Sequence, residues 1–104
     1  ERSSMADYQL SIKAEHDLTE IYIFSYENFG EAKADAYLIG LEETFTHLAE
    51  NPLLGRRIDY IRAGYFRYEY IGHAVFYVRA GKGIKIVRVL HNSMNIDMHL
   101  KDSR

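Results

Sequence analysis

Arginine dominates a cationic segment in the second half of this chain. Between residues 51 and 90, eight Lys and Arg residues are opposed only by Asp59 and Glu69. The cations are Arg56, Arg57, Arg62, Arg67, Arg79, Lys82, Lys85 and Arg88. A planar guanidinium can donate two parallel hydrogen bonds to a carboxylate or a phosphate. The segment therefore favours a surface that binds acidic side chains or phosphates. The alternative is a solvated sheet face on which the Arg stems cover aromatic rings.

Arg88 and His91 are the most informative residues of this segment. Arg88 lies in a run of β-branched residues, where a charge needs a partner. It either pairs internally, with Glu69 or an acid of the first half, or lines a groove that opens to solvent. His91 follows that run, and an imidazole with a reference pKa of about 6.5 can act as a general acid or base. A single His does not make an active site.

No other pattern indicates catalysis or metal binding. The five His, at positions 16, 47, 73, 91 and 99, include no pair with the i, i+4 spacing of a His-Glu-x-x-His motif. Neither a Walker loop nor a Gly-x-Ser-x-Gly elbow is present. Gly81-Lys82-Gly83 is typical of a turn. We expect no catalytic residue, no metal and no cofactor.

Acidic residues dominate the first half of the chain and basic residues dominate the second half. Residues 1–50 carry 3 Lys and Arg against 11 Asp and Glu, whereas residues 51–104 carry 10 against 4. The formal net charge is nevertheless only -2. Dedicated nucleic-acid-binding domains are usually strongly basic, so we expect no direct sequence-specific contact with nucleic acid, although a local basic patch can touch phosphates.

Length and composition bound the domain and its compartment. We expect one domain over residues 6–104, after an added leader or a disordered start at residues 1–5. The longest uninterrupted apolar stretch, Ala74–Val78, is far shorter than the roughly 20 residues of a membrane-spanning helix. Cys is absent, which suits a reducing cytoplasm and excludes disulfides and thiolate metal sites. We therefore expect a cytoplasmic protein with no membrane partner.

The first half of the chain predicts a strand and two helices. Apolar and polar residues alternate over residues 8–13, which is typical of a half-buried strand. From Ala14 the spacing becomes helical and ends at Gly30, a residue favoured just beyond a helix. A second helical stripe spans residues 34–48 and stops at Asn51-Pro52. The short connection favours an antiparallel helical hairpin with an acidic outer surface.

The second half predicts a sheet. Residues 65–71, 74–80 and 84–90 are aromatic and β-branched, and two or three residues separate each pair, which favours an antiparallel meander. We expect Ile84, Ile86 and Leu90 on one face of the last strand and Val87 and Val89 on the other, as in a central strand. We expect residues 96–100 to form a final turn or a strand-like tail. The fold class is therefore α+β, in the order β-α-α-β-β-β, with the hairpin packed on an antiparallel sheet.

Two segments and one single residue resemble the ParE toxins of the RelE/ParE toxin–antitoxin superfamily. They are Leu-Ala-Glu-Asn-Pro-Leu-Leu-Gly-Arg at residues 48–56, Arg67, and Ile-Val-Arg-Val-Leu-His-Asn-Ser-Met-Asn at residues 86–95. The Arg-Val-Leu-His run with the nearby Met94 is the most specific motif. The resemblance covers nearly the whole chain, and it implies the same β-α-α-β-β-β order.

The resemblance implies a bacterial toxin without enzymatic activity. Such a protein inhibits DNA gyrase, needs no cofactor, and is neutralised by a ParD-like antitoxin in a hetero-oligomer. We expect the basic sheet and the resembling motif to bind these partners. The predicted partner-binding residues are Arg62, Arg67, Arg79, Arg88, His91 and Met94.

Two alternatives remain. The RelE branch cuts mRNA on the ribosome, and His91 with Arg62, Arg67 and Arg88 would then form the site. That chemistry needs a base with an orienting group, but no Tyr follows Tyr77 and His91 has no evident acidic partner in sequence. The other alternative is a binding module without toxicity that merely receives an antitoxin.

Overall fold

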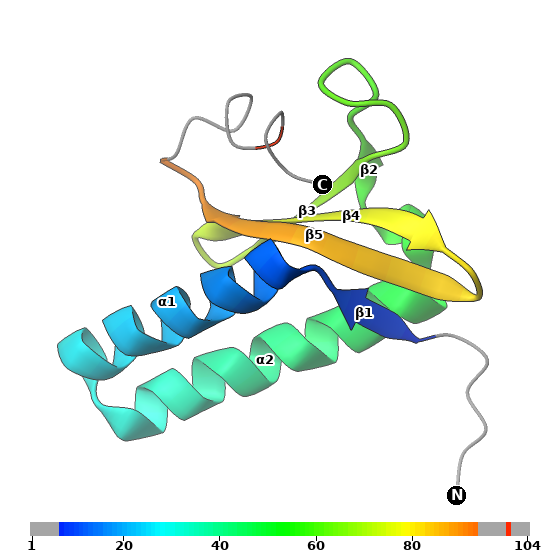
Figure 1. Cartoon of the computed structure of the whole chain (residues 1–104). Coiled ribbons are helices and arrows are strands. Elements are labelled where there is room, and N and C mark those ends of the chain that lie inside the picture. The colour runs from blue at the N-terminus through cyan, green and yellow to red at the C-terminus, as the bar shows by residue number, and fades with distance from the viewer. Residues whose placement is uncertain (1–6, 94–99, 101–104) are drawn as a thin grey trace, which may run out of the picture.

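Two helices cover one face of a five-stranded sheet (Figure 1). The computed structural model describes residues 7–93 and Leu100. Its elements are β1 (Tyr8–Leu10), α1 (Ile12–Phe29), α2 (Glu31–Glu50), a 3-10 turn (Pro52–Leu54), β2 (Arg56–Arg57), β3 (Phe66–Tyr70), β4 (His73–Ala80) and β5 (Gly83–His91). The predicted fold class is confirmed, and so is the predicted order apart from the additional short strand β2. The proposed leader at residues 1–5 and Met94 lie outside the described residues.

Ser11 lies between β1 and α1 and caps the N-terminus of the helix. Its backbone N–H donates to the carbonyl of Ile86 at 3.0 Å, and its hydroxyl donates to the carbonyl of Val87 at 2.7 Å. The same hydroxyl accepts from the N–H of Ala14 at 2.9 Å, as a helix N-cap does. One buried side chain therefore begins the helix and fixes its start against β5.

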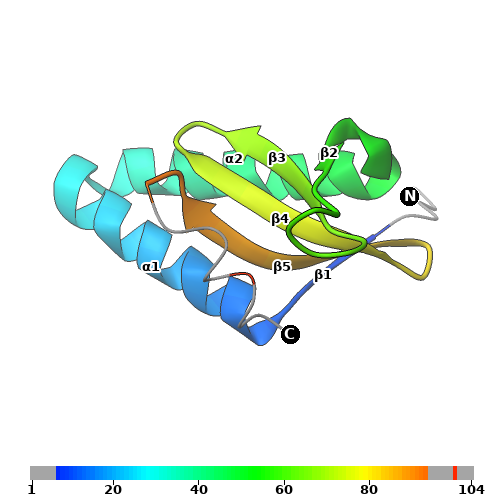
Figure 2. The same ribbon diagram turned by 90° about the horizontal axis from the view of Figure 1, so that it is seen from above.

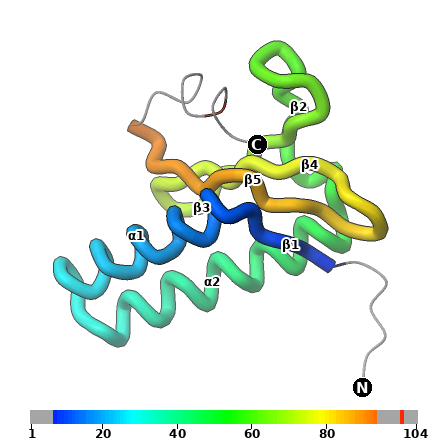
Figure 3. Tube along the Cα trace, viewed as in Figure 1, coloured from blue at the N-terminus to red at the C-terminus, as the bar shows by residue number. Residues whose placement is uncertain are grey.

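The helical hairpin is confirmed. Gly30 separates α1 from α2 with a φ of 91°, a conformation that glycine adopts without steric cost. The trace in Figure 3 runs out along α1 and returns along α2. α2 ends at Glu50 with Asn51 as its C-cap, just before Pro52, as the sequence predicts.

The prediction of a purely antiparallel sheet is wrong for its first strand, because β1 joins in parallel and makes the sheet mixed. The strand order is β1-β5-β4-β3-β2, with β1 parallel to β5 and the other pairs antiparallel. β5 thus has neighbours on both sides, as its two apolar faces predict. The two-residue β2 was not predicted, since both of its residues are Arg and carry no alternation.

A β-bulge changes the faces of β5. Phe76 of β4 pairs with Arg88 and Tyr77 pairs with Ile86, so the register skips Val87. The predicted face assignment is therefore wrong beyond the bulge, because one extra residue reverses the alternation. Val89 packs in the helix-side core and Leu90 packs on the other face.

The sheet separates two apolar cores. The core under the helices contains Leu41, Phe45 and Leu48 of α2 with the inner faces of β3, β4 and β5. The core on the other face is made by Ile58, Tyr65, Ala74, Phe76, Val87, Leu90 and Leu100. Leu100 is fully buried there, and the rest of the predicted 96–100 tail lies outside the described residues. No helix within residues 7–93 is long and apolar enough to cross a membrane.

Candidate functional site

Arg88 pairs with Asp17 of α1. The guanidinium donates from Nε at 2.8 Å and from Nη2 at 2.9 Å to the two carboxylate oxygens. The N–H of Val89 also donates to Asp17, at 3.0 Å. The two side chains are only 13% and 11% exposed, and the hydrogen bonds raise the pKa of Arg88. Of the two alternatives for Arg88, internal pairing with an acid of the hairpin is correct, and Glu69 is not the partner.

Arg67 covers an aromatic ring on the face away from the helices. Its guanidinium lies 5.5 Å from the ring centroid of Phe76, donates to Glu69, and reaches Asn92 at 3.4 Å. The side chain is 18% exposed. Much of this charge is therefore neutralised within the chain.

Arg62 is also engaged within the chain. Its Nη1 donates to the carbonyl of Leu100 at 3.0 Å, and its guanidinium lies 5.5 Å from the ring of Tyr65. Arg62 thus lies over the second core, beside the buried Leu100.

Arg79 is different, because its side chain is exposed near the far end of β4. Within residues 7–93 and Leu100 its side chain makes neither a hydrogen bond nor an ion pair. His73 and His91 pair at the opposite end of the β4–β5 ladder, and Arg67 reaches Asn92 there. The structure therefore does not bring the described members of the predicted site into one cluster, because Arg79 and His91 lie at opposite ends of the β4–β5 ladder and Arg88 pairs with α1 between them.

His91 lies beside a second imidazole. The ring centroids of His73 and His91 are 5.3 Å apart, and the Nδ1 of His91 accepts from the N–H of Ser93. The Nδ1 of His73 lies 2.7 Å from the hydroxyl of Tyr37. Burial, and then the neighbouring His91, lower the pKa of His73, while burial raises the pKa of Tyr37 to about 12.

Sequence reasoning missed His73, Tyr37 and Asp17 as members of these sites. Counting outward from the turn at residues 81–82 would have brought His73 near His91. No comparable signal in the sequence points to Asp17, because its pairing with Arg88 depends on how α1 packs on the sheet.

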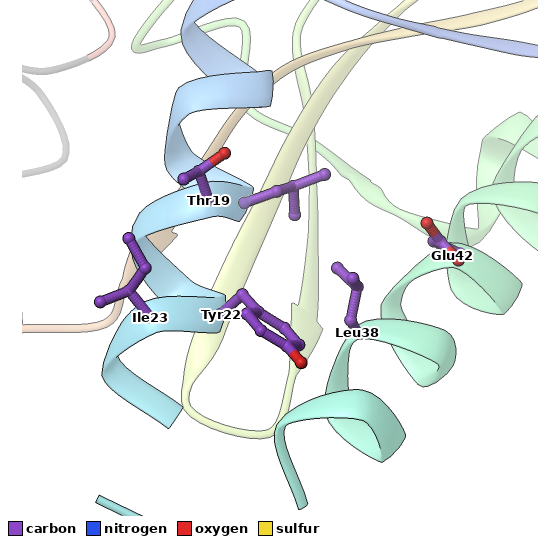
Figure 4. A pocket seen from close by; sticks show the side chains of 6 residues that line it. Thr19, Tyr22, Ile23, Leu38 and Glu42 are labelled. Carbon is purple, nitrogen blue, oxygen red and sulfur yellow. The ribbon is translucent and has the colours of Figure 1, made fainter. Parts of the chain in front are cut away.

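A groove runs between the two helices on their outer side. It has a volume of about 290 Å³ and is lined by Leu18, Thr19, Tyr22, Ile23, Leu38 and Glu42. Figure 4 shows Tyr22 of α1 and Leu38 of α2 pointing toward each other across it. The hydroxyl of Tyr22 donates to Asp35 at 2.7 Å, which raises the pKa of Tyr22 to about 12. The groove thus combines an apolar floor with an acidic rim.

Comparison with known proteins gives a consistent result. Residues 8–96 match the family model described as the ParE toxin of the type II toxin–antitoxin system parDE. The chain is 41% identical to Toxin ParE1 of Caulobacter vibrioides over 96 residues, which cover 92% of this chain and 99% of that protein. It is 39% identical to Toxin ParE1 of Mycobacterium tuberculosis over 94 residues, which cover 89% and 96%.

A solved structure supports the fold. The chromosomal ParDE TA system from P. aeruginosa aligns with a TM-score of 0.70 at 23% identity, over 86% of this chain and 98% of that chain. At this identity the likeness bears on the fold alone.

Proposed function

Because this chain belongs to the ParE toxin family of type II toxin–antitoxin systems, we propose that it inhibits DNA gyrase and is neutralised by a ParD-like antitoxin. The observation that carries the proposal is the family match over residues 8–96, with about 40% identity to two toxins over most of their length. We place the protein in the cytoplasm, where its target acts.

The toxin acts by binding rather than by catalysis. Arg62, Arg67, Arg79, His91 and Met94 are the proposed contacts with partners. Arg88 contributes as a positioning residue, because its pair with Asp17 holds α1 against β5. A surface of guanidinium groups is suited to acidic side chains and phosphates.

The groove between α1 and α2 is suited to binding a helix of the antitoxin. An amphipathic helix lays its apolar face into a groove of this kind. Nanomolar affinity corresponds to about -12 kcal/mol, whereas an exposed ion pair contributes only about 0–1 kcal/mol. Apolar anchors must therefore provide most of the affinity, and Ile23 and Leu38 offer them. Toxin and antitoxin then form a hetero-oligomer.

A supercoiling assay tests the gyrase proposal. Purified toxin should block supercoiling by gyrase or raise the level of cleaved complex, and topoisomerase IV run in parallel reports selectivity. Antitoxin added first should restore supercoiling. Full gyrase activity at a stoichiometric excess of folded toxin would overturn the proposal.

A second function, mRNA cleavage on the ribosome, is favoured by one observation. His73 places a second imidazole beside His91, and two adjacent imidazoles are suited to general acid and base roles in cleaving a phosphodiester. Ribosomes programmed with a defined mRNA should then yield cut fragments, and His91→Ala or His73→Ala should abolish cutting. Intact mRNA after incubation with wild-type toxin would exclude this function.

A further inference from the structure

A second hollow lies at the edge of the sheet, away from the helical groove. It has a volume of about 380 Å³ and its floor includes Leu53, Phe66 and Val78. Two guanidinium groups, those of Arg57 and Arg79, also line it. The hollow therefore offers apolar contact and positive charge together.

The backbone beside this hollow is an unpaired strand edge. β3 begins at Phe66, which pairs with Tyr77 of β4. β4 continues for three more residues, Val78–Ala80, whose described ladder partners all belong to β5. In Figure 2 the β4–β5 hairpin extends beyond β2 and β3. The side of β4 that faces the hollow is thus open to another strand.

The charges at this edge favour an acidic ligand. The side chain of Arg79 is exposed and makes no hydrogen bond or ion pair with the described part of the chain. The Nε of Arg57 donates a hydrogen bond to the carboxylate of Asp59 at 2.9 Å. Asp59 also accepts from the N–H of Gly64 at 2.7 Å. Asp59 is therefore held on two sides, and Arg79 is the cation that can meet a new carboxylate.

We propose that the edge of β4 at Val78–Ala80 binds an extended acidic segment of the antitoxin as an added strand. Main-chain hydrogen bonds to an open edge supply affinity, and pockets for alternate side chains supply specificity. Successive side chains of a strand point to opposite faces, so apolar and acidic residues can alternate. The apolar side chains enter the hollow and a carboxylate meets Arg79.

This assignment rests on the proposed function for the identity of the partner, because it names the antitoxin. It differs from the helical groove in chemistry, since the groove has an acidic rim and this edge is cationic. An antitoxin that uses both sites contains a helix followed or preceded by an acidic extended segment.

The edge can be tested with defined peptides. The probes are an acetylated Glu-Val-Glu-Val-Glu-Val amide and its Lys-Val counterpart, titrated against the full chain at two salt concentrations. The Glu peptide should bind and the Lys peptide should not. Arg79→Glu should weaken binding at least tenfold, whereas Lys82→Glu, the same charge change in the adjacent turn, should weaken it less than threefold.

A second pair of variants tests the apolar floor. Leu53 is 70% exposed and lines the hollow, whereas its neighbour Leu54 is 53% exposed and does not. Leu53→Ser should weaken the Glu peptide severalfold, and Leu54→Ser should leave its affinity unchanged. Equal losses for both members of either pair would overturn the proposal, as would the absence of binding.

Hydrogen exchange of the toxin–antitoxin complex tests the partner. Amides within residues 78–80 should exchange at least tenfold more slowly in the co-purified complex than in the toxin alone. Unchanged exchange there would overturn the assignment to the antitoxin. Neither result depends on gyrase, so failure here and failure of the supercoiling assay are distinguishable.

Discussion

Asp17 and Arg88 are 71 residues apart in sequence and form a two-point ion pair at 2.8 and 2.9 Å between α1 and β5. The carboxylate also accepts from the N–H of Val89. Both side chains are nearly buried, so each charge is stabilised by the opposite charge of the other residue. An acid of the acidic first half and an Arg of the basic second half therefore pair inside the molecule rather than on its surface.

Asp17→Ala should destabilise the fold by about 3–5 kcal/mol, because it removes the carboxylate that pairs with the nearly buried Arg88. Urea unfolding followed by circular dichroism gives the free energy. The double variant Asp17→Leu/Arg88→Met should lose less than the single variant, since no unpaired charge remains. A double variant that is less stable than Asp17→Ala would contradict this explanation.

Tyr77→Phe should cost about 1–3 kcal/mol, because its hydroxyl accepts from the buried N–H of Gly55 at 2.8 Å and donates to the carbonyl of Pro52 at 2.7 Å. Removing it leaves that N–H without an acceptor. Tyr60→Phe is the control, since Tyr60 is 79% exposed. Equal stability of the two variants in thermal unfolding would show that these bonds contribute nothing.

Stability should fall as the pH drops below about 6.5, the ordinary His pKa. The pKa of His73 is lowered in the folded state, so the unfolded chain binds the proton first. The contribution is complete above the unfolded pKa and is lost below it. Unfolding free energies between pH 7.5 and 5.5 measure the loss, and His73→Gln should reduce it. A loss of the same size in His73→Gln as in the wild type would contradict this explanation.

Ile23→Asp should weaken antitoxin binding at least tenfold, because it places a charge in the apolar groove between the helices. Ile23 is 44% exposed in the free toxin, so the fold should tolerate the change. Ile39→Asp is the matched control, since Ile39 is 53% exposed on α2 and does not line the groove. Calorimetric titration with antitoxin measures both. Equal losses would place the antitoxin elsewhere on the hairpin.

The elements of the fold follow from local sequence signals. Gly30 and Pro52 mark the ends of the helices, and the short turns at residues 71–72 and 81–82 mark the strands of the meander. These residues act on the backbone next to them, so one sequence is enough to interpret them.

The arrangement of the site depends on contacts between distant segments. The bulge at Val87 arises from the match between two strands, and the partner of Arg88 depends on where α1 rests on the sheet. The cluster of Arg residues predicted a single cationic surface. For Arg88 the sequence left internal pairing open but could not identify Asp17, because that pairing is a product of tertiary packing. Glu69 lies two residues from Arg67 on the same strand, and this local pairing was not recognised.

The parallel pairing of β1 with β5 also sets the order in which the toxin can mature. Ser11 bonds to the carbonyl of Val87, 76 residues later, so the start of α1 has no sheet to rest on until nearly all of the chain has left the ribosome. Until then the apolar inner sides of both helices lack the strands that cover them in the folded protein. For the antitoxin proposed above, this leaves a period in which it can meet the chain before the sheet is complete.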